Sequence, residues 1–169
     1  MLDPDAIIRP VQPADRPLID RLHASVFGPG RFARSAYRVR EGTPYASPYC
    51  RLALLAGRAI AALRMTPVRI GETPGALLLG PLAVDPEFAN RGYGRRLVAD
   101  AFAAAKADGF RLVVLVGNLS YYERMQFVAA PRGQIWLPGP ADPVRILAHE
   151  LVPGSIADYR GLVTADQAA

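Results

Sequence analysis

An apolar segment that leads into a glycine-containing turn and then an amphipathic helix limits the folds open to this chain more than any other feature. Residues 76–84 are almost entirely apolar, and this lack of alternation predicts a central strand covered on both faces. Apolar residues then recur at helical spacing before Gly109, namely Leu97, Val98, Ala101, Phe102 and Ala105. Residues 111–116 predict a further buried strand. Together these elements indicate a crossover between two parallel strands, so we expect an α/β protein.

The central strand contains an interruption at Gly80-Pro81. Proline has no N–H to donate to a ladder, so this pair predicts a bulge or a local break in strand pairing. Further strands are predicted at 7–9, 50–56, 59–70 and 144–151. Helices are predicted at 13–27, 31–41 and 120–125. The pair Gly57-Arg58 has the length of a two-residue hairpin loop between two of the strands.

Length and composition predict one globular domain over residues 1–169, because 51% of the residues are hydrophobic and 21% are charged. The net charge is +5, and Lys106 is the only lysine among the 20 basic residues. Arginine forks bind phosphate well, so an anionic partner is considered. Cys50 has no second cysteine to pair with, and no apolar run reaches the length of a membrane span. We therefore expect a cytoplasmic protein with no membrane partner.

The turn Arg91-Gly92-Tyr93-Gly94 lies between the predicted central strand and the start of the helix. Backbone N–H groups at a helix N-terminus attract anions, and glycines let a phosphate approach the backbone closely. Arg91, Arg95 and Arg96 add positive charge beside this turn. The alternative is an ordinary tight connection with arginines facing solvent.

Three other phosphate-binding or nucleic-acid-binding motifs fit this turn poorly. A nucleoside triphosphatase loop needs Gly-Lys-Ser/Thr, and no lysine stands here. A dinucleotide-binding loop needs a third glycine where this chain has Leu97. An RNA-recognition strand would continue with aromatic residues, whereas Arg95 and Arg96 follow and the segment becomes helical. We therefore expect no nucleic-acid partner.

Two segments together resemble the GCN5-related N-acetyltransferase (GNAT) family, and in particular its small bacterial YhbS-like branch. They are Gly80-Pro81-Leu82-Ala83-Val84-Asp85-Pro86-Glu87-Phe88 with the turn and helix that follow, and Tyr121-Tyr122-Glu123-Arg124-Met125-Gln126-Phe127. The late segment 150–154 also has a counterpart in that branch. The resemblance implies a mixed sheet of about six to seven strands, largely antiparallel with a splayed parallel pair, flanked by helices.

The resemblance implies acetyl-CoA as the donor and Tyr122 as the general acid that protonates the departing thiolate. It implies that the pantetheine arm pairs with the broken strand and that the pyrophosphate lies on the turn. The implied cofactor-binding residues are Leu82, Ala83, Val84, Arg91, Gly92, Tyr93, Gly94, Arg95, Arg96 and Asn118. The chain departs from the family pattern at Ala89, where Gln or Arg is usual, and at Gln126, where Gly is usual.

Acetyl transfer to an amine requires a neutral amine, a donor to the tetrahedral oxyanion and an acid for the leaving group. A backbone amide near Leu82 or Ala83 is the expected oxyanion donor. The sequence leaves the general base open between Asp85 with Glu87, Glu72, Glu41 and a base acting through water. His23 and His149 fit surface or core positions better than catalysis, and Cys50 has no adjacent histidine and acid to make it a nucleophile.

The acceptor is expected to be a small-molecule or peptide amine, bound between residues 31–40 and residues 134–142. The stripe Arg31, Arg34 and Arg38 either favours an acidic acceptor or forms a solvated face, and Trp136 either lines the pocket or fills the core. No metal-ligand cluster is expected, and a homodimer is one compatible assembly. A donor with a longer acyl chain, on CoA or acyl carrier protein, and a non-catalytic acyl-CoA binding module remain alternatives.

Overall fold

The computed structural model describes residues 1–30 and 35–169. The chain contains both helices and strands, as the sequence predicts for an α/β protein. The helices are α1 (Arg16–Phe27), α2 (Ser35–Arg40), α3 (Tyr93–Ala107) and α4 (Leu119–Tyr122). The strands are β1 (Ile7–Pro10), β2 (Arg51–Leu55), β3 (Arg58–Ile70), β4 (Thr73–Val84), β5 (Leu112–Val116), β6 (Val128–Ala129), β7 (Ile135–Trp136), β8 (Ile146–Glu150) and β9 (Gly161–Ala165). No helix in the described part of the chain is long and apolar enough to cross a membrane.

The strands form one mixed sheet in the order β1-β2-β3-β4-β5-β8-β6, with β9 pairing β3 and β7. The neighbours β4 and β5 are parallel and are connected by α3, which confirms the predicted crossover. The pair β7 and β9 is also parallel, and the other strand pairs are antiparallel. The mixed, largely antiparallel sheet flanked by helices is the fold that the family resemblance implies.

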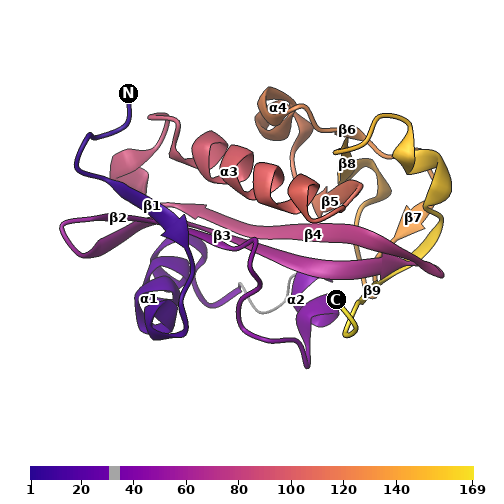
Figure 1. Cartoon of the computed structure of the whole chain (residues 1–169), viewed down its shortest axis with the longest axis horizontal. Helices are drawn as coiled ribbons and strands as arrows, with labels where there is room; N and C mark the ends of the chain where they lie inside the picture. Colours follow the sequence, from indigo (N-terminus) through magenta and orange to yellow (C-terminus); the bar gives the residue numbers. More distant parts are fainter. Residues whose placement is uncertain (31–34) are drawn as a thin grey trace.

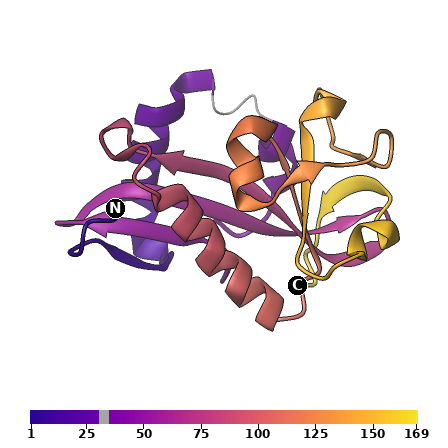
Figure 2. The same cartoon turned by 90° about the horizontal axis from the view of Figure 1, so that it is seen from above.

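Helices cover both faces of the sheet (Figures 1 and 2). Helix α3 lies on one face, and four of its apolar side chains are buried against strands β2, β3, β4 and β5. They are Leu97, Val98, Ala101 and Ala105. Helices α1 and α2 lie on the opposite face, where Ile19, Leu22 and Val39 are buried. The two faces of β4 are therefore both covered, as its continuous apolar sequence predicts.

The sheet opens where β4 contains Gly80-Pro81. Along β3 and β4, Leu63 lies opposite Leu82 and Met65 lies opposite Leu79, so Gly80 and Pro81 both face Arg64, a single residue. This is a β-bulge, and it confirms the predicted irregularity. On the other side of β4, pairing with β5 covers only Ala76 to Leu78, although β4 continues to Val84. The parallel pair is therefore splayed beyond Leu78.

Several predicted boundaries are corrected by the structure. The hairpin loop between β2 and β3 is Ala56-Gly57 instead of Gly57-Arg58, and both residues have positive φ, as a type I′ turn requires. Helix α2 ends at Arg40, one residue before the predicted end, and residues 31–34 lie outside the described residues. The last long strand begins at Ile146 instead of Val144, because Asp142 accepts a hydrogen bond from the Val144 N–H and caps a short 3-10 turn.

Strand β9 is absent from the sequence prediction. It pairs with the far end of β3, where Val68, Arg69 and Ile70 lie opposite Ala165, Thr164 and Val163. Its first residue, Gly161, has φ +131°, and a Cβ there would lie 2.7 Å from Cα of Gly71. Two backbones therefore pass each other too closely for a side chain. This close approach depends on tertiary structure. In the sequence it is marked only by the glycine, which has no side chain to prevent it.

A partly buried ion pair near the N-terminus holds β1 to the start of α1. Arg9 donates two hydrogen bonds to Asp15, from Nη1 at 2.7 Å and from Nη2 at 2.8 Å. Asp15 is buried and also accepts a hydrogen bond from the Gln12 N–H. The hydrogen bonds from Arg9 lower the pKa of Asp15 below its ordinary value, despite the opposing effect of burial.

We expect Asp15→Asn to lower the free energy of unfolding by about 1–3 kcal/mol at pH 7. Because the pKa of Asp15 is lower in the folded state, the unfolded chain binds its proton first as the pH falls. The stabilisation by Asp15 is therefore present above about pH 4 and is lost as the pH falls through the folded pKa. Urea unfolding of both proteins between pH 7 and pH 3 measures this. A difference that stays constant over that range would contradict it.

Candidate functional site

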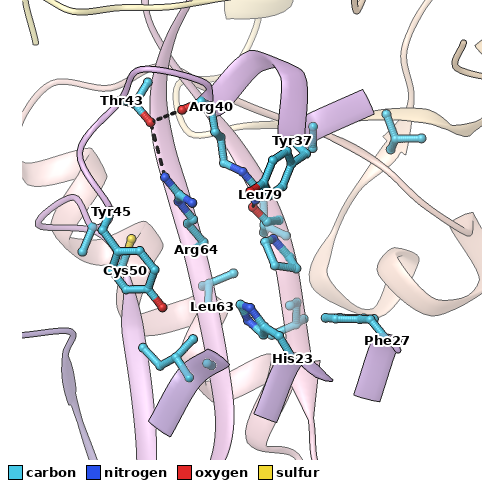
Figure 3. A pocket seen from close by; sticks show the side chains of 18 of the residues that line it. His23, Phe27, Tyr37, Arg40, Thr43, Tyr45, Cys50, Leu63, Arg64 and Leu79 are labelled. Carbon is cyan, nitrogen blue, oxygen red and sulfur yellow. Dashed lines mark hydrogen bonds between the residues drawn. The ribbon is translucent and has the colours of Figure 1, made fainter. Parts of the chain in front are cut away.

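A cavity of about 820 Å³ lies between α1, α2, the bulge of β4 and the loop before β8 (Figure 3). The strand residues Leu79, Gly80, Pro81 and Leu82 form part of its wall. Side chains from α1 and α2 and the loop residues 140–142 form other parts. Of residues 31–40 and 134–142, from which the sequence predicts an acceptor pocket, the cavity is lined by Ala36, Tyr37, Arg40 and 140–142, and residues 31–34 lie outside the described residues. Trp136 takes neither predicted position, because it lies on β7, is 47% exposed and does not line this cavity.

The predicted phosphate turn leads directly into α3. Gly92 is the N-cap of α3 and has φ +96°, a backbone conformation that residues other than glycine rarely adopt. The first N–H groups of the helix have no partner within the helix itself, and its dipole is positive there. The side chains of Arg91, Arg95 and Arg96 are exposed beside this end of α3. The turn therefore has the geometry of an anion site.

Tyr93 can contribute only its backbone to that turn. Its side chain is 1% exposed, packs edge-on against Phe88 and accepts a hydrogen bond from the Asp3 N–H at 3.0 Å. The aromatic residue in the Arg-Gly-Tyr-Gly motif thus belongs to the core. Arg91 is oriented by Phe88, because its guanidinium lies 5.1 Å from the centre of that ring.

Gly94 marks the point where the turn, strand β4 and helix α4 converge. A Cβ at Gly94 would lie 2.8 Å from the Tyr121 hydroxyl, 3.5 Å from Leu82 Cδ2 and 3.7 Å from Val84 Cγ2. Tyr121, which is expected only to pack, therefore brings its hydroxyl to the start of α3. No local sequence pattern indicates this contact, because it depends on how α4 lies over the sheet. The structure brings Leu82, Val84 and Gly94 together.

Tyr122 lies at the end of α4 and lines the cavity. Its ring packs edge-on against Phe127, with ring centres 5.7 Å apart. A Cβ at Gly117 would lie 2.6 Å from Cε2 of Tyr122, so the glycine allows the ring to lie against the end of β5. Asn118 is the N-cap residue of α4, and its carbonyl accepts hydrogen bonds from the N–H groups of Tyr121 and Tyr122. Asn118 thus positions both tyrosines through its backbone.

Asp85 and Glu87, the carboxylate pair considered as a general base, are both engaged elsewhere. Arg58 donates to Asp85 and forms an ion pair with Glu87 at 2.8 Å. Asp85 also accepts a hydrogen bond from the Glu87 N–H at 3.0 Å. Neither carboxylate lines the cavity described above. The pair therefore caps and anchors the segment after β4, and of the other carboxylates considered, Glu41 lines the cavity while Glu72 does not.

The histidines and the cysteine have different surroundings. His149 packs against Phe102 and Phe127, and its Nδ1 lies 3.1 Å from the Gln126 carbonyl. Burial lowers the pKa of His149 below its ordinary value, and the side chain is half-buried beside these two rings. His23 lines the cavity from α1 (Figure 3). Cys50 is buried, with Sγ 3.4 Å from the Met65 N–H nitrogen.

The comparisons with known proteins agree with this arrangement. The model of the acetyltransferase (GNAT) family matches residues 19–127. YhbS of Escherichia coli K12, an uncharacterised N-acetyltransferase, is 27% identical over an alignment of 162 residues that covers 93% of this chain and 94% of that protein.

Two solved structures provide a three-dimensional comparison. The crystal structure of E. coli YhbS in complex with CoA has a TM-score of 0.82 at 25% identity, covering 99% of this chain and 94% of that chain. A GNAT acetyltransferase of Brucella melitensis in complex with acetyl-CoA has a TM-score of 0.63 at 25% identity, covering 85% of this chain and 95% of that chain. The family resemblance is thereby confirmed: the chain has the GNAT fold and belongs to the GNAT family of acetyltransferases.

Proposed function

We propose that this protein transfers an acetyl group from acetyl-CoA to a primary amine, by direct attack within a ternary complex. One observation carries the proposal: β4 loses its β5 partner beyond Leu78, at a point that lies between the start of α3 and the cavity. An extended ligand can pair with the exposed strand edge, its phosphates can reach the helix N-terminus, and a second substrate can enter from the cavity. CoA and acetyl-CoA are bound by the two relatives of known structure.

The residues at this position suit CoA. The backbone of Leu82, Ala83 and Val84 would pair with the pantetheine amides, and the N–H groups of residues 91–95 would bind the pyrophosphate. Gly94 lets α4 and β4 approach this turn closely, because a Cβ there would lie 2.8 Å from the Tyr121 hydroxyl. The guanidinium groups of Arg91, Arg95 and Arg96 would add charge-assisted contacts, and Asn118 would contact the cofactor from the start of α4.

When bound, acetyl-CoA supplies a thioester carbonyl as the electrophile. A backbone N–H near Leu82 or Ala83 would donate to the oxyanion that develops as the amine attacks. The Tyr122 hydroxyl would then give its proton to the departing thiolate, which leaves as a thiol. His23 and Glu41 are the candidates in the cavity wall that could accept the amine proton, directly or through water. Asp85 and Glu87 would serve the fold through Arg58 instead.

We expect Tyr122→Phe to retain CoA binding and to lose about 100-fold or more in kcat, because the phenol proton is then missing from the transition state. The control is Tyr49→Phe, whose hydroxyl donates to Asp108 at 2.8 Å outside the cavity. Thiol release with an active amine measures kcat, and CoA titration measures binding. Full turnover by the Tyr122 variant would contradict the assignment.

We expect Gly92→Ala to weaken CoA binding, because the N-cap conformation at φ +96° directs the first amides of α3. Gly109→Ala provides a matched control at the opposite end of the same helix, where φ is +87° and no atom lies within 4 Å of the added Cβ. Both variants should lose about 1 kcal/mol of stability from backbone strain. Equal CoA affinity in the two variants, measured by calorimetry, would show that the turn does not bind the cofactor.

A thermal-shift titration with CoA, acetyl-CoA and longer acyl-CoAs tests the donor. A ligand that binds the native state raises the melting temperature as its concentration rises. We expect this for CoA and acetyl-CoA, with acetyl-CoA at least as effective as the longer donors. A clear preference for long chains would instead favour an acyltransferase with a longer donor. Stabilisation by CoA without thiol release on any amine would favour a non-catalytic binding module.

A further inference from the structure

Two arginines that line the cavity, Arg40 and Arg64, come from segments next to the bulge of β4. Arg64 lies on β3 directly opposite Gly80-Pro81, and Arg40 at the end of α2 donates a hydrogen bond to the Gly80 carbonyl. Figure 3 shows both side chains toward one end of the cavity, with His23 and Phe27 toward the other. The bulge therefore brings positive charge next to the strand where the proposed transfer takes place.

On the basis of the proposed function, we propose that the acceptor is a primary amine that also carries a carboxylate or phosphate group, and that Arg64, together with Arg40, binds this oxyanion. Arg64 and Arg40 are separate from the residues of the predicted phosphate turn, which lie at the start of α3.

Arg64 is partly buried, and its hydrogen-bond partners are neutral. Its Nη2 donates to Thr43 Oγ1 at 3.3 Å and to the Pro44 carbonyl at 3.0 Å. Its guanidinium also lies 5.6 Å from the centre of the Tyr45 ring. No carboxylate lies within ion-pair distance of Arg64 among residues 1–30 and 35–169. Burial lowers the pKa of Arg64, which is the expected consequence of holding a cation with little compensation.

Arg40 is only 8% exposed, and its guanidinium lies 5.6 Å from the centre of the Tyr37 ring. One of its N–H groups is directed to the Gly80 carbonyl. The guanidinium is thereby fixed at the bulge by a strand, a helix and an aromatic ring. A rigid planar fork of this kind binds carboxylate or phosphate with little loss of conformational entropy.

Among the described residues, the carboxylates that line the cavity are Asp20, Glu41 and Asp142; all three are exposed, and none forms an ion pair with Arg64. Asp20 interacts with Arg16 at 3.7 Å and accepts a hydrogen bond from the Tyr45 hydroxyl at 3.5 Å. Glu41 and Asp142 are exposed, and Asp142 caps the turn before β8. Burial, with a smaller effect of Asp20, raises the pKa of Tyr45 to about 12, so its phenol stays neutral. Arg64 and Arg40 are thus the more buried charged groups of this wall, whereas its carboxylates are exposed to solvent.

An oxyanion on the acceptor would complete this arrangement. A partly buried cation with neutral partners is costly, and a ligand oxyanion would offset that cost through charge-assisted hydrogen bonds. The same contact would hold the acceptor so that its amine can point along the bulge toward Leu82. A neutral amine of equal size would leave the guanidinium of Arg64 uncompensated and would bind more weakly.

The test uses pairs of amines that differ only in the anionic group. L-phenylalanine is compared with L-phenylalaninamide, L-glutamate with L-glutamine amide, and phosphoethanolamine with ethanolamine. Binding to the full chain is measured by calorimetry with and without saturating CoA, and thiol release is measured with acetyl-CoA. We expect at least one anionic member to bind at least about tenfold more tightly than its neutral partner. The carboxylate and phosphate pairs identify which oxyanion is preferred.

Variants of Arg64 test whether this residue causes the preference for anionic amines. We expect Arg64→Gln to remove the preference for the anionic member and Arg64→Lys to retain part of it, because lysine keeps the charge but not the fork. Arg69→Gln is the matched control on the same strand, since Arg69 donates to the Glu72 carbonyl and does not line the cavity. It should keep the full preference.

Two results would overturn the proposal. One is equal or weaker binding of every anionic member relative to its neutral partner in the wild-type protein, which is decisive even if a variant fails to fold. The other is an anion preference that survives Arg64→Gln unchanged. Loss of CoA binding and of all thiol release would instead refute the proposed function, and the binding measurements without CoA would still decide whether the cavity prefers oxyanions.

Discussion

The separation of β4 from β5 is the constraint on which the rest of the site depends. Their parallel pairing covers Ala76 to Leu78 and then stops, although both strands continue. The bulge at Gly80-Pro81 changes the register with β3 at the same place, so the strand bends where its second partner is lost. A central strand with both faces buried is thereby left with one open edge, and polar backbone groups at such an edge need a partner.

The neighbouring helices place functional groups around the open edge of β4. Helix α3 presents its N-terminus beside Leu82 and Val84 through Gly94, and α4 brings Tyr121 and Tyr122 to the same place. On the opposite side, α1 and α2 leave a cavity whose inner charges come from arginine. The bulge in β4 thus lies between two places: the start of α3, where we propose that the phosphate-bearing donor binds, and the cavity, where we propose that the acceptor binds.

Much of this arrangement follows from local sequence. Gly80-Pro81 predicts the break in β4, the spacing of Leu97 to Ala105 predicts α3, and the glycines predict the tight turn before that helix. Other parts depend on tertiary contacts that leave no local pattern. The pairing of β9 with β3, the position of the Tyr121 hydroxyl at Gly94, the burial of Tyr93 and the ion pairs of Arg58 with Asp85 and Glu87 are of this kind. Arg64 is similar, because its sequence context is an ordinary strand and only its place opposite the bulge leads to the role proposed for it.

Amide hydrogen exchange, measured with and without saturating acetyl-CoA, tests the central claim most directly. Pairing of the cofactor with the open edge of β4 and binding of its phosphates at the start of α3 should slow exchange in residues 82–84 and 91–96 together. The distal strands β1 and β9 should change little. Protection elsewhere, with exchange in those two segments unaffected, would show that the opening between β4 and β5 is not the cofactor site.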